Sequence, residues 1–512
     1  MTEEHFDRFM GDSDGIMWTI ERDPFLRSTI TVIFLLETAP DWELVRRRTE
    51  HATHLIPRLR QRVVEVPLRL APPRWVTDGY LDLDYHLRRI VAPAPGDTGR
   101  VLRLAESLAA RAFDTQRPLW EAVLCEGLEG GRAAMVLKIH HSVTDGVGGM
   151  RLLRYLVDLE RDAPEPAQQP AAAGERISGP ALTLDALTHT GRQATGSARS
   201  FLGSVLQGLA SAVRNPAKAA TDALQLAGSV GRVLAPITST MSPIMKERSL
   251  RRRMDVIDVP LDDLRAAARA AGGTLNDAFV AAVAGGLHRY HVLHSDPVPE
   301  LRMTMPVSTR EDDDPLGGNR FMPARLPVPV AVQDPGERVR RVGEVCHAWQ
   351  REPALPLTNA LATVLDHLPG RITTTVFGGM LEHIDFLTTN VPGSPVTLYF
   401  GGAGVERIWA LAPTMGCSVN VALISYAGTC GIGFVTDLAA VPDADALLAC
   451  MRESFDEVLA LAPGAAATAG GEERPAMPGP GGPDAGGAAD QGASRSETSS
   501  ASVSELNVTR AS

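Results

Sequence analysis

The sequence predicts an α/β protein of two lobes joined by a helical crossover, and three observations carry this prediction. At 512 residues the chain is too long for one ordinary core, so two domains are expected. Strand-like and helix-like segments alternate over residues 1–162 and again over residues 254–462. Between them, residues 163–253 open with a proline- and alanine-rich connector and continue as helices. Residues 463–512 lack apolar side chains to bury, so we expect a disordered tail.

The first lobe is expected to begin with a buried strand. The run "TITVIFLLE" from Thr29 to Glu37 is short and β-branched, which is typical of such a strand. A helix with its cap near Asp41 follows, and "WEAVLCEGLEGGRAAMVLKIHH" then predicts a hairpin that turns at Gly130-Gly131. Apolar residues recur at helical spacing from Met150 onward. The "HH" pair therefore lies at the end of a strand, on the loop before a helix.

The crossover is locally basic in an acidic protein. Between Ala186 and Arg253 only Asp222 and Glu247 oppose the Lys and Arg residues, and the helices break at Asn215-Pro216. Such a stretch can lie on anionic lipid. It can also be a crossover packed on both lobes, which we favour because surface helices are commonly charged.

The second lobe repeats the alternation of helix and strand. Residues 276–294, "NDAFVAAVAGGLHRYHVLH", predict a helix, and residues 301–310, "LRMTMPVSTR", predict a strand. Two late strands are expected at residues 416–428, "GCSVNVALISYAG", and at residues 430–437, "CGIGFVTD".

Bulk properties exclude several classes of protein. A formal charge of −11 argues against a general nucleic-acid binder, which needs a surplus of basic residues. The five cysteines form no CxxC pair, which favours a reducing compartment and no structural zinc. The acidic start does not resemble a signal peptide, and no apolar run is long enough to span a membrane. We expect a cytoplasmic protein whose contact with membranes is at most peripheral.

Two local patterns are expected to carry no chemistry. "GDSDG" (Gly11 to Gly15) fits the G-x-S-x-G pattern of hydrolases, but the buried strand that must precede such a nucleophile is missing. His288, His291 and His294 lie three residues apart without an acidic partner. Their position near the end of a helix predicts structural histidines rather than metal ligands.

The pattern His140-His141-x-x-x-Asp145-Gly146 predicts a catalytic site. Adjacent residues of an extended segment point to opposite sides, so one histidine should pack and the other should face a cavity. An imidazole can accept the proton of an alcohol, a contribution of about 10²–10⁴-fold to the rate. The alternative, a purely structural cluster, requires partners for three buried polar groups.

The rest of the motif is expected to shape the loop. Asp145 cannot easily reach the same cavity and suits an ion pair that holds the loop, while Gly146 permits unusual backbone angles. Gly148 and Gly149 would let a ligand approach the backbone closely. No Ser or Cys nucleophile accompanies the base, which favours direct attack of an alcohol on an activated thioester, with a separate donor for the oxyanion.

These residues carry a resemblance to a known family. "HHSVTDG" is similar to the HHxxxDG signature of CoA-dependent acyltransferases related to chloramphenicol acetyltransferase and to peptide-synthetase condensation domains. Further motifs narrow the resemblance to the bacterial wax ester synthase/diacylglycerol acyltransferase family. These motifs are "PLW" (118–120), "LNDAFVAAV" (275–283), "MPVSTR" (305–310), "GGNRF" (317–321), "TNVPGS" (389–394) and "SYAG…GFVTD" (425–437).

The resemblance implies two chloramphenicol-acetyltransferase-like lobes that face each other across a channel. It assigns His141 as the general base, His140 as its structural neighbour, and Asp145 as the residue that orients the loop, with Arg310 as a candidate partner. It also implies that Asn276 and Asp277 contribute to substrate binding. Long-chain acyl-CoA is the implied co-substrate, and no bound cofactor or metal is expected.

The opening segment departs from the family pattern. "GDSDGIMWTIE" keeps Asp14 and Glu21 but lacks the usual proline and aromatic residue, and "FLRSTITVIFLLE" replaces the usual P-M-H. Chain-length and acceptor preferences are therefore expected to differ from those of other members.

The expected reaction is transfer of a long acyl group to diacylglycerol, to a fatty alcohol, or to both. Two alternatives stay open at this point. One is a related acyltransferase that makes another lipid or polyketide ester. The other is a non-catalytic protein that binds a membrane or lipid droplet through the basic crossover.

Overall fold

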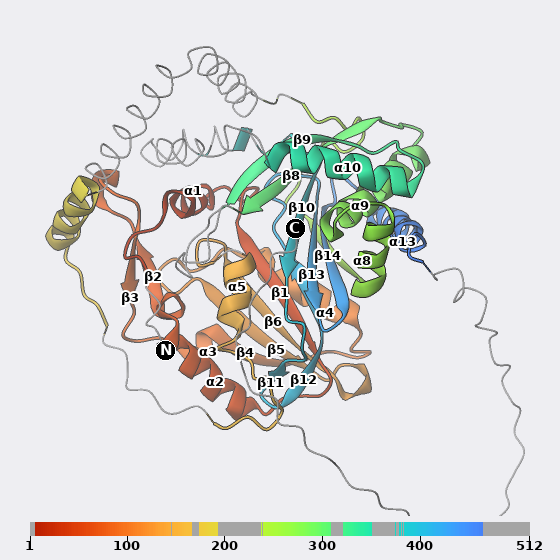
Figure 1. The fold of residues 1–512 in the computed structure, drawn as a ribbon. Helices are drawn as coiled ribbons and strands as arrows, with labels where there is room; N and C mark the ends of the chain where they lie inside the picture. The colour runs from red at the N-terminus through yellow and green to blue at the C-terminus, as the bar shows by residue number, and fades with distance from the viewer. Residues whose placement is uncertain are drawn as a thin grey trace, which may run out of the picture.

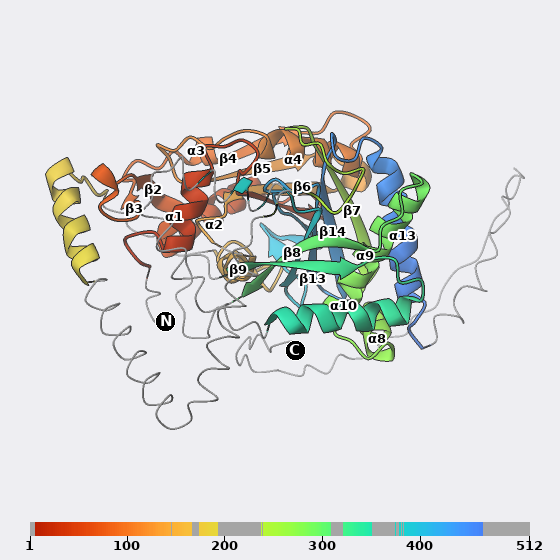
Figure 2. The same ribbon diagram turned by 90° about the horizontal axis from the view of Figure 1, so that it is seen from above.

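The computed structural model describes residues 6–144, 146–165, 174–192, 239–308, 321–350 and 383–463, together with residues 237, 374, 378–379 and 381. They form two six-stranded sheets with helices around them (Figure 1). Seen from above, strands β2–β6 lie on one side of the molecule and helices α8–α10 on the other (Figure 2). The predicted α/β architecture of two lobes is confirmed.

The first sheet has the strand order β11-β12-β1-β6-β5-β4. Its strands are β1 (Thr29–Leu36), β4 (Leu87–Val91), β5 (Trp120–Glu126), β6 (Ala133–His140), β11 (Tyr399–Phe400) and β12 (Ala403–Leu411). Around it lie α1 (Asp12–Ile20), α2 (Trp42–Leu55), α3 (Leu83–His86), α4 (Thr98–Ala109), α5 (Gly146–Leu153) and the hairpin of β2 (Gln61–Val64) and β3 (Arg74–Thr77).

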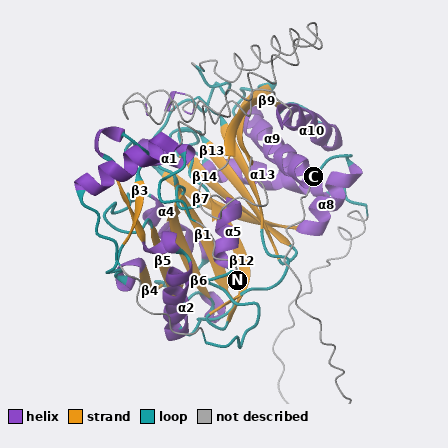
Figure 3. Ribbon diagram, turned by 60° about the vertical axis from the view of Figure 1, so that its left-hand side comes forward, coloured by secondary structure: helices purple, strands orange, loops and turns teal. Residues whose placement is uncertain are grey.

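The second sheet has the strand order β7-β14-β13-β10-β8-β9. Its strands are β7 (Arg252–Pro260), β8 (Glu300–Ser308), β9 (Phe321–Pro329), β10 (Phe386–Pro392), β13 (Val419–Tyr426) and β14 (Thr429–Asp437). Helices α8 (Leu261–Ala270), α9 (Leu275–Leu293), α10 (Pro335–Gln350) and α13 (Ala444–Leu459) gather on one side of this sheet (Figure 3). From Ala278 to Leu287 every residue of α9 is apolar and buried, so this part of the helix forms the centre of the lobe's core.

The local predictions for the first lobe are largely confirmed. β1 matches the β-branched run, and the Asp41 carboxylate caps α2 by accepting a hydrogen bond of 2.9 Å from the Leu44 N–H. β5 and β6 form the predicted hairpin, and Gly130 and Gly131 both adopt positive φ at its turn. The helix after the motif differs: it begins at Gly146 and ends at Leu153. The next residues form turns, in which the N–H groups of Tyr155 and Leu156 bond the carbonyls of Leu152 and Leu153.

The C-terminal half of the chain completes the first sheet. β12 pairs antiparallel with β1, with Thr31 opposite Leu411 and Phe34 opposite Ile408, and β11 extends this edge. The predicted boundary at residue 254 divides the chain into two segments, but the first sheet contains strands from both of them. The amino-acid pattern of β12 indicates a strand, whereas its partner is set by long-range pairing that no local pattern reports.

Only part of the predicted crossover lies within the described residues, including a helix over residues 179–192. Asn215-Pro216 lies outside them, as does the expected tail from residue 464. Of the basic residues between Ala186 and Arg253, four also lie outside: Arg199, Arg214, Lys218 and Arg232. At the end of the crossover, Arg252 pairs with buried Asp437 at 2.9 Å, and Arg253 pairs with Asp255 at 3.0 Å and with Asp445 at 2.5 Å. These two arginines hold β7 within its lobe. Their ion pairs favour the interpretation that the end of the crossover packs on the protein rather than on lipid.

Candidate active site

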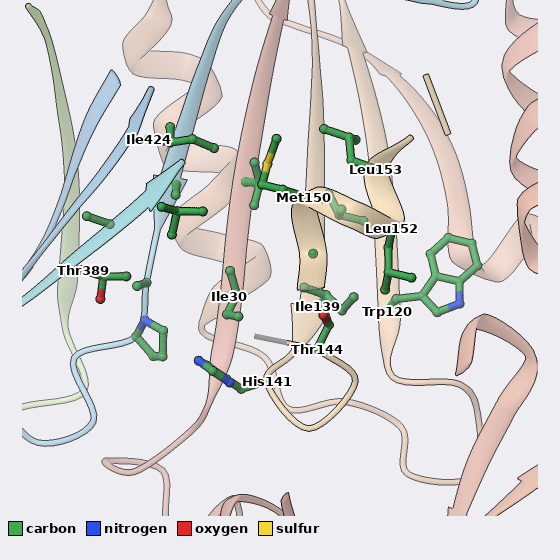
Figure 4. Close-up of a pocket in the computed structure, with 18 of the residues that line it drawn as sticks. Ile30, Trp120, Ile139, His141, Thr144, Met150, Leu152, Leu153, Thr389 and Ile424 are labelled. Carbon is green, nitrogen blue, oxygen red and sulfur yellow. The ribbon is translucent and has the colours of Figure 1, made fainter. Parts of the chain in front are cut away.

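A cavity of about 250 Å³ lies between the two lobes, and both lobes contribute to its wall. The first lobe supplies residues of β1, β5, β6, α2 and α5, and the second supplies residues of β8, β10 and β13. The lining is mostly aliphatic and aromatic, with a few polar side chains among the apolar ones (Figure 4). A cavity of this character accommodates an aliphatic chain and excludes water from it.

The alternation along β6 explains the paired histidines. Every second residue from Met135 to His141 lines the cavity: Met135, Leu137, Ile139 and His141. Lys138 and His140, between them, are fully buried on the opposite face. The prediction that the two histidines point to opposite sides is confirmed, with His141 on the cavity side.

His141 lies just past the end of β6. Its backbone N–H donates a 2.8 Å hydrogen bond to the Ser28 carbonyl, so the residue is held beside the start of β1. Figure 4 shows the ring of His141 at one end of the labelled residues, near Ile30, while Leu153 and Ile424 lie toward the other end. An imidazole in this place can meet a reacting group at the end of an apolar passage.

His140 is fixed by two partners. The Ser142 backbone N–H donates to Nδ1 at 3.1 Å, so Nδ1 is an acceptor and the neutral ring carries its proton on Nε2. Nε2 lies 3.3 Å from Oε2 of Glu21, and the same oxygen accepts a 2.8 Å hydrogen bond from the Ser28 N–H. Because the Ser28 carbonyl accepts the hydrogen bond of the His141 N–H, Glu21 supports the ring of His140 directly and the backbone of His141 through Ser28. The sequence shows that Glu21 is shared with the family pattern but does not indicate its role.

A second charged group, the ammonium of Lys138, lies on the buried face of β6 that is opposite the cavity. The ammonium of Lys138 donates to Glu121 Oε1 at 2.9 Å and to the Arg111 carbonyl at 3.0 Å, and it lies 4.1 Å from the centroid of the Phe113 ring. Burial lowers the pKa of Lys138, and Glu121 opposes that shift. This network ties β6 to β5 and makes the face opposite the cavity rigid.

Replacing Glu21 with alanine is expected to disturb both histidines. The variant leaves the Ser28 N–H unsatisfied, at a cost of about 1–3 kcal/mol for a buried donor, and removes the carboxylate that lies 3.3 Å from His140 Nε2. We expect a lower free energy of unfolding and kcat/KM for acyl transfer reduced by about 10-fold or more.

Glu21→Gln keeps an acceptor and should recover much of the lost stability. Asp84→Ala, which removes an exposed ion pair with Arg46, is the matched control and should cost no more than about 1 kcal/mol. Chemical denaturation of the three variants checks this, and a Glu21→Ala protein as stable and active as the parent would exclude the supporting role.

The loop that follows the histidines is described in part. Thr144 and Gly149 line the cavity, and Gly146 is the first residue of α5. Gly148 is buried but is not among the described lining residues. Asp145 and its candidate partner Arg310 lie outside the described residues.

Asn276 and Asp277 lie at the start of α9. The Asp277 carboxylate accepts hydrogen bonds of 2.8 Å from both the backbone N–H and the hydroxyl of Thr274, and Asp277 is 1 % exposed. The Thr274 hydroxyl in turn accepts from the Asp277 N–H, which completes a capping box. The amide of Asn276 lies 3.7 Å from the Met305 sulfur. Neither residue is among the described residues that line the cavity. The hydrogen bonds of Asp277 are those of a helix cap.

Replacing Asp277 with alanine is expected to act on stability rather than on substrate binding. Loss of the cap should lower the free energy of unfolding by about 1–2 kcal/mol. KM for acyl-CoA should stay unchanged, since the carboxylate does not reach the cavity. Steady-state kinetics beside urea denaturation checks this, with exposed Asp262 of α8 as the control position; a raised KM in a stable Asp277→Ala protein would restore the predicted binding role.

The two patterns that were expected to carry no chemistry have structural places. "GDSDG" forms the beginning of α1, with Gly11 as its N-cap, and the described residues before it, from residue 6 on, contain no strand of the kind that a nucleophile elbow requires. His291 contacts the Leu287 carbonyl and the Ser242 hydroxyl, whereas His294 contacts the Tyr290 carbonyl and Asp443. His288 contacts Gln333. The three imidazoles therefore have separate partners, and the prediction that none has an acidic partner is wrong for His294, which lies 3.1 Å from Asp443.

Comparison with known families matches most of the chain. Residues 10–279 match the model of the wax ester synthase/diacylglycerol acyltransferase catalytic domain, and residues 317–458 match the model of the C-terminal domain of the same family. A putative diacylglycerol O-acyltransferase of Mycobacterium tuberculosis is 36% identical over 457 residues, which cover 89% of this chain and 93% of the relative. A second putative diacylglycerol O-acyltransferase of that species is 29% identical, over 89% of this chain and 98% of the relative.

Solved structures with the same fold include two kinds of enzyme domain. The wax ester synthase/diacylglycerol acyltransferase from Marinobacter aquaeolei VT8 superposes with a TM-score of 0.57 at 20% identity, covering 89% of this chain and 99% of that one. The starter condensation domain of rhizomide synthetase, solved with C8-CoA, gives a TM-score of 0.57 at 13% identity, with 89% and 94% coverage. The predicted fold class is therefore confirmed at the level of overall architecture.

Proposed function

The chain belongs to the wax ester synthase/diacylglycerol acyltransferase family, and we propose that His141 is the general base of its acyl transfer. The protein is an acyltransferase of the diacylglycerol O-acyltransferase and wax ester synthase type. The observation that carries the proposal is the position of His141, which lines an apolar cavity between the lobes while its neighbour His140 is buried in the packing behind it.

The reaction needs one proton acceptor. The acceptor hydroxyl oxygen attacks the thioester carbonyl carbon of a long-chain acyl-CoA while an imidazole nitrogen of His141 takes the hydroxyl proton. The tetrahedral intermediate then collapses, the carbon–sulfur bond breaks, and the imidazolium returns the proton to the leaving sulfur to give free CoA. No covalent acyl-enzyme is required, because the thioester is already activated.

The cavity lining favours the alcohol over water as the acceptor. Ile30, Val32 and Phe34 from β1 face Leu387 and Val391 from β10 across it, and these surfaces offer water no hydrogen bonds. Two aliphatic chains, one from the acyl donor and one from the acceptor, gain free energy by entering such a space. Exclusion of water protects the thioester from hydrolysis.

The remaining motif residues take supporting roles in this proposal. Asp145, paired with an arginine such as Arg310, would orient the loop that carries His141, and Gly149 would admit the substrate beside α5. Diacylglycerol and a long-chain fatty alcohol are both proposed acceptors, because each presents one hydroxyl on an otherwise apolar molecule.

One assay tests the function directly. Purified full-length protein is given labelled palmitoyl-CoA with diacylglycerol and hexadecanol in competition, and the products are separated by chromatography. We expect labelled triacylglycerol, wax ester or both, with release of an equal amount of CoA. Binding of acyl-CoA without release of CoA above the enzyme-free rate would instead indicate a lipid-binding protein.

Contact with a membrane stays a prediction. Among the residues that the structure describes, no helix is long and apolar enough to cross a membrane. Since Arg252 and Arg253 form ion pairs within the second lobe, they are unsuitable positions for testing lipid contact. Neutralising Arg199, Arg214 and Lys218 and measuring sedimentation with anionic vesicles is the appropriate test of the basic crossover.

A further inference from the structure

Asn420 is a buried polar residue in the wall of the cavity. It lies on β13, where Ala422 and Ile424 from the same face of the strand also line the cavity. Asn420 is 1 % exposed, and its Nδ2 donates a 2.6 Å hydrogen bond to the Pro413 carbonyl. A carbonyl oxygen only accepts, so this bond fixes the orientation of the amide with its nitrogen toward Pro413.

The other end of this amide has no partner. Oδ1 of Asn420 is buried and makes no hydrogen bond within the part of the chain that the structure describes. A buried acceptor without a donor is costly, and native proteins rarely leave one unless a ligand or water satisfies it. A bound water needs several polar partners, whereas the neighbouring wall residues Ala422 and Ile424 offer aliphatic surface. Oδ1 is therefore a site for a hydrogen-bond donor on a substrate.

Strand pairing places Asn420 near the catalytic end of the cavity. Thr29 of β1 pairs with His140 on one side, and Thr31 pairs with Leu411 on the other, so Pro413 lies two residues beyond Leu411 toward the level of Thr29. Two strand spacings, about 10 Å, then separate the backbones near Pro413 and His141. Since Asn420 is bonded to Pro413, its amide and the imidazole of His141 serve the same region of the cavity.

On this basis, and resting on the proposed acyl transfer, we propose that Asn420 is a specificity-determining residue that binds a second hydroxyl of the acceptor. The ester carbonyls of diacylglycerol are acceptors and cannot pair with Oδ1, and the one hydroxyl of a simple fatty alcohol is taken by His141. A lipid with two free hydroxyls close together, such as a long-chain 1,2-diol or a monoacylglycerol, presents one hydroxyl to His141 and donates the other to Asn420.

The amide N–H groups of the CoA pantetheine arm offer the same donor chemistry. That arm carries several further polar groups, each of which would need its own partner in a dry cavity. An isolated acceptor among aliphatic side chains instead suits a mostly apolar molecule with one extra donor. We therefore assign Oδ1 to the acceptor lipid, and the experiment separates the two sources.

The test compares two acceptors that differ by one hydroxyl. Wild-type protein is assayed with palmitoyl-CoA and either hexadecanol or 1,2-hexadecanediol, and kcat/KM is measured for each. We expect the diol to be preferred by about 3- to 10-fold, beyond the statistical advantage of its two hydroxyls. Absence of transfer to any alcohol or acylglycerol would contradict the proposed function itself, whereas transfer without this preference would contradict only the role of Asn420.

Two variants complete the test. Asn420→Leu removes the acceptor and should abolish the preference, while both alcohols share any general loss of activity from the broken bond to Pro413. Asn420→Asp, which burial keeps protonated, can donate to Pro413 and retains a free carbonyl oxygen, so the preference should persist. Should Asn420→Leu preserve the diol preference, or instead raise KM for palmitoyl-CoA equally with both alcohols, the assignment to the acceptor hydroxyl is overturned. The second of these results assigns Oδ1 to pantetheine.

Discussion

Replacing His141 with alanine is expected to lower kcat/KM for acyl transfer by at least about 10²-fold without unfolding the protein. The side chain lines the cavity and is not fully buried, so its removal enlarges an existing space. The loss should appear in kcat with palmitoyl-CoA and hexadecanol, because the base acts on the reacting hydroxyl rather than on chain binding. Release of the CoA thiol gives a direct measurement.

The neighbouring histidine is the natural control for this result. His140→Ala removes a fully buried ring that lies between Ser142 and Glu21, and should lower the free energy of unfolding by about 1–3 kcal/mol for each group left unsatisfied. We therefore expect the substitution of His141 to lower mainly the activity and the substitution of His140 to lower mainly the stability. A His141→Ala protein that transfers acyl groups at the parental rate would remove the general base from the mechanism.

The second large effect is expected at Gly433, which lies on β14 where the two sheets meet. A Cβ at this position would lie 2.1 Å from the Ala410 carbonyl oxygen of β12, and one at Gly431 would lie 2.2 Å from the Ile408 carbonyl oxygen. Both obstacles are backbone atoms of a paired strand, which cannot rotate away. We expect Gly433→Ala to lower the free energy of unfolding by about 1–3 kcal/mol or more, measured by urea denaturation.

Gly179 provides the matched control for that substitution. A Cβ there would meet nothing within 4 Å, so Gly179→Ala should leave the stability unchanged or raise it slightly. Equal stability of the Gly433→Ala and parent proteins would mean that β12 and β14 are not pressed together in solution.

The sequence predicts what depends on local spacing and misses what depends on distant pairing. The opposite directions of His140 and His141 follow from the two-residue period of a strand, and the cap at Asp41 follows from its position before an apolar repeat. The contact between Glu21 and His140 joins segments far apart in the chain, so no spacing could reveal it. The only indication in the sequence is that the opening segment shares Glu21 with the family pattern.

Asp277 illustrates how one local pattern can support two interpretations. Its motif suggested substrate binding, yet the T-x-x-D pattern from Thr274 to Asp277 is also the pattern of a capping box with a shortened acid, and that local interpretation accounts for its contacts. Asn420 gives no signal in the sequence, because an amide within a strand-like run is informative only once one end is known to bond a carbonyl and the other to be buried without a partner among the described residues.

The return of β11 and β12 to the first sheet bears on how this enzyme can be divided. A fragment ending before residue 254 would expose the long apolar edge of β1, the strand next to the one that bears the histidines, as a template for self-association. The catalytic motif is thus encoded in one half of the polypeptide, but the strands that cover the edge of its sheet are encoded in the other. Neither half is a transferable module, and recombination between relatives has to exchange both together.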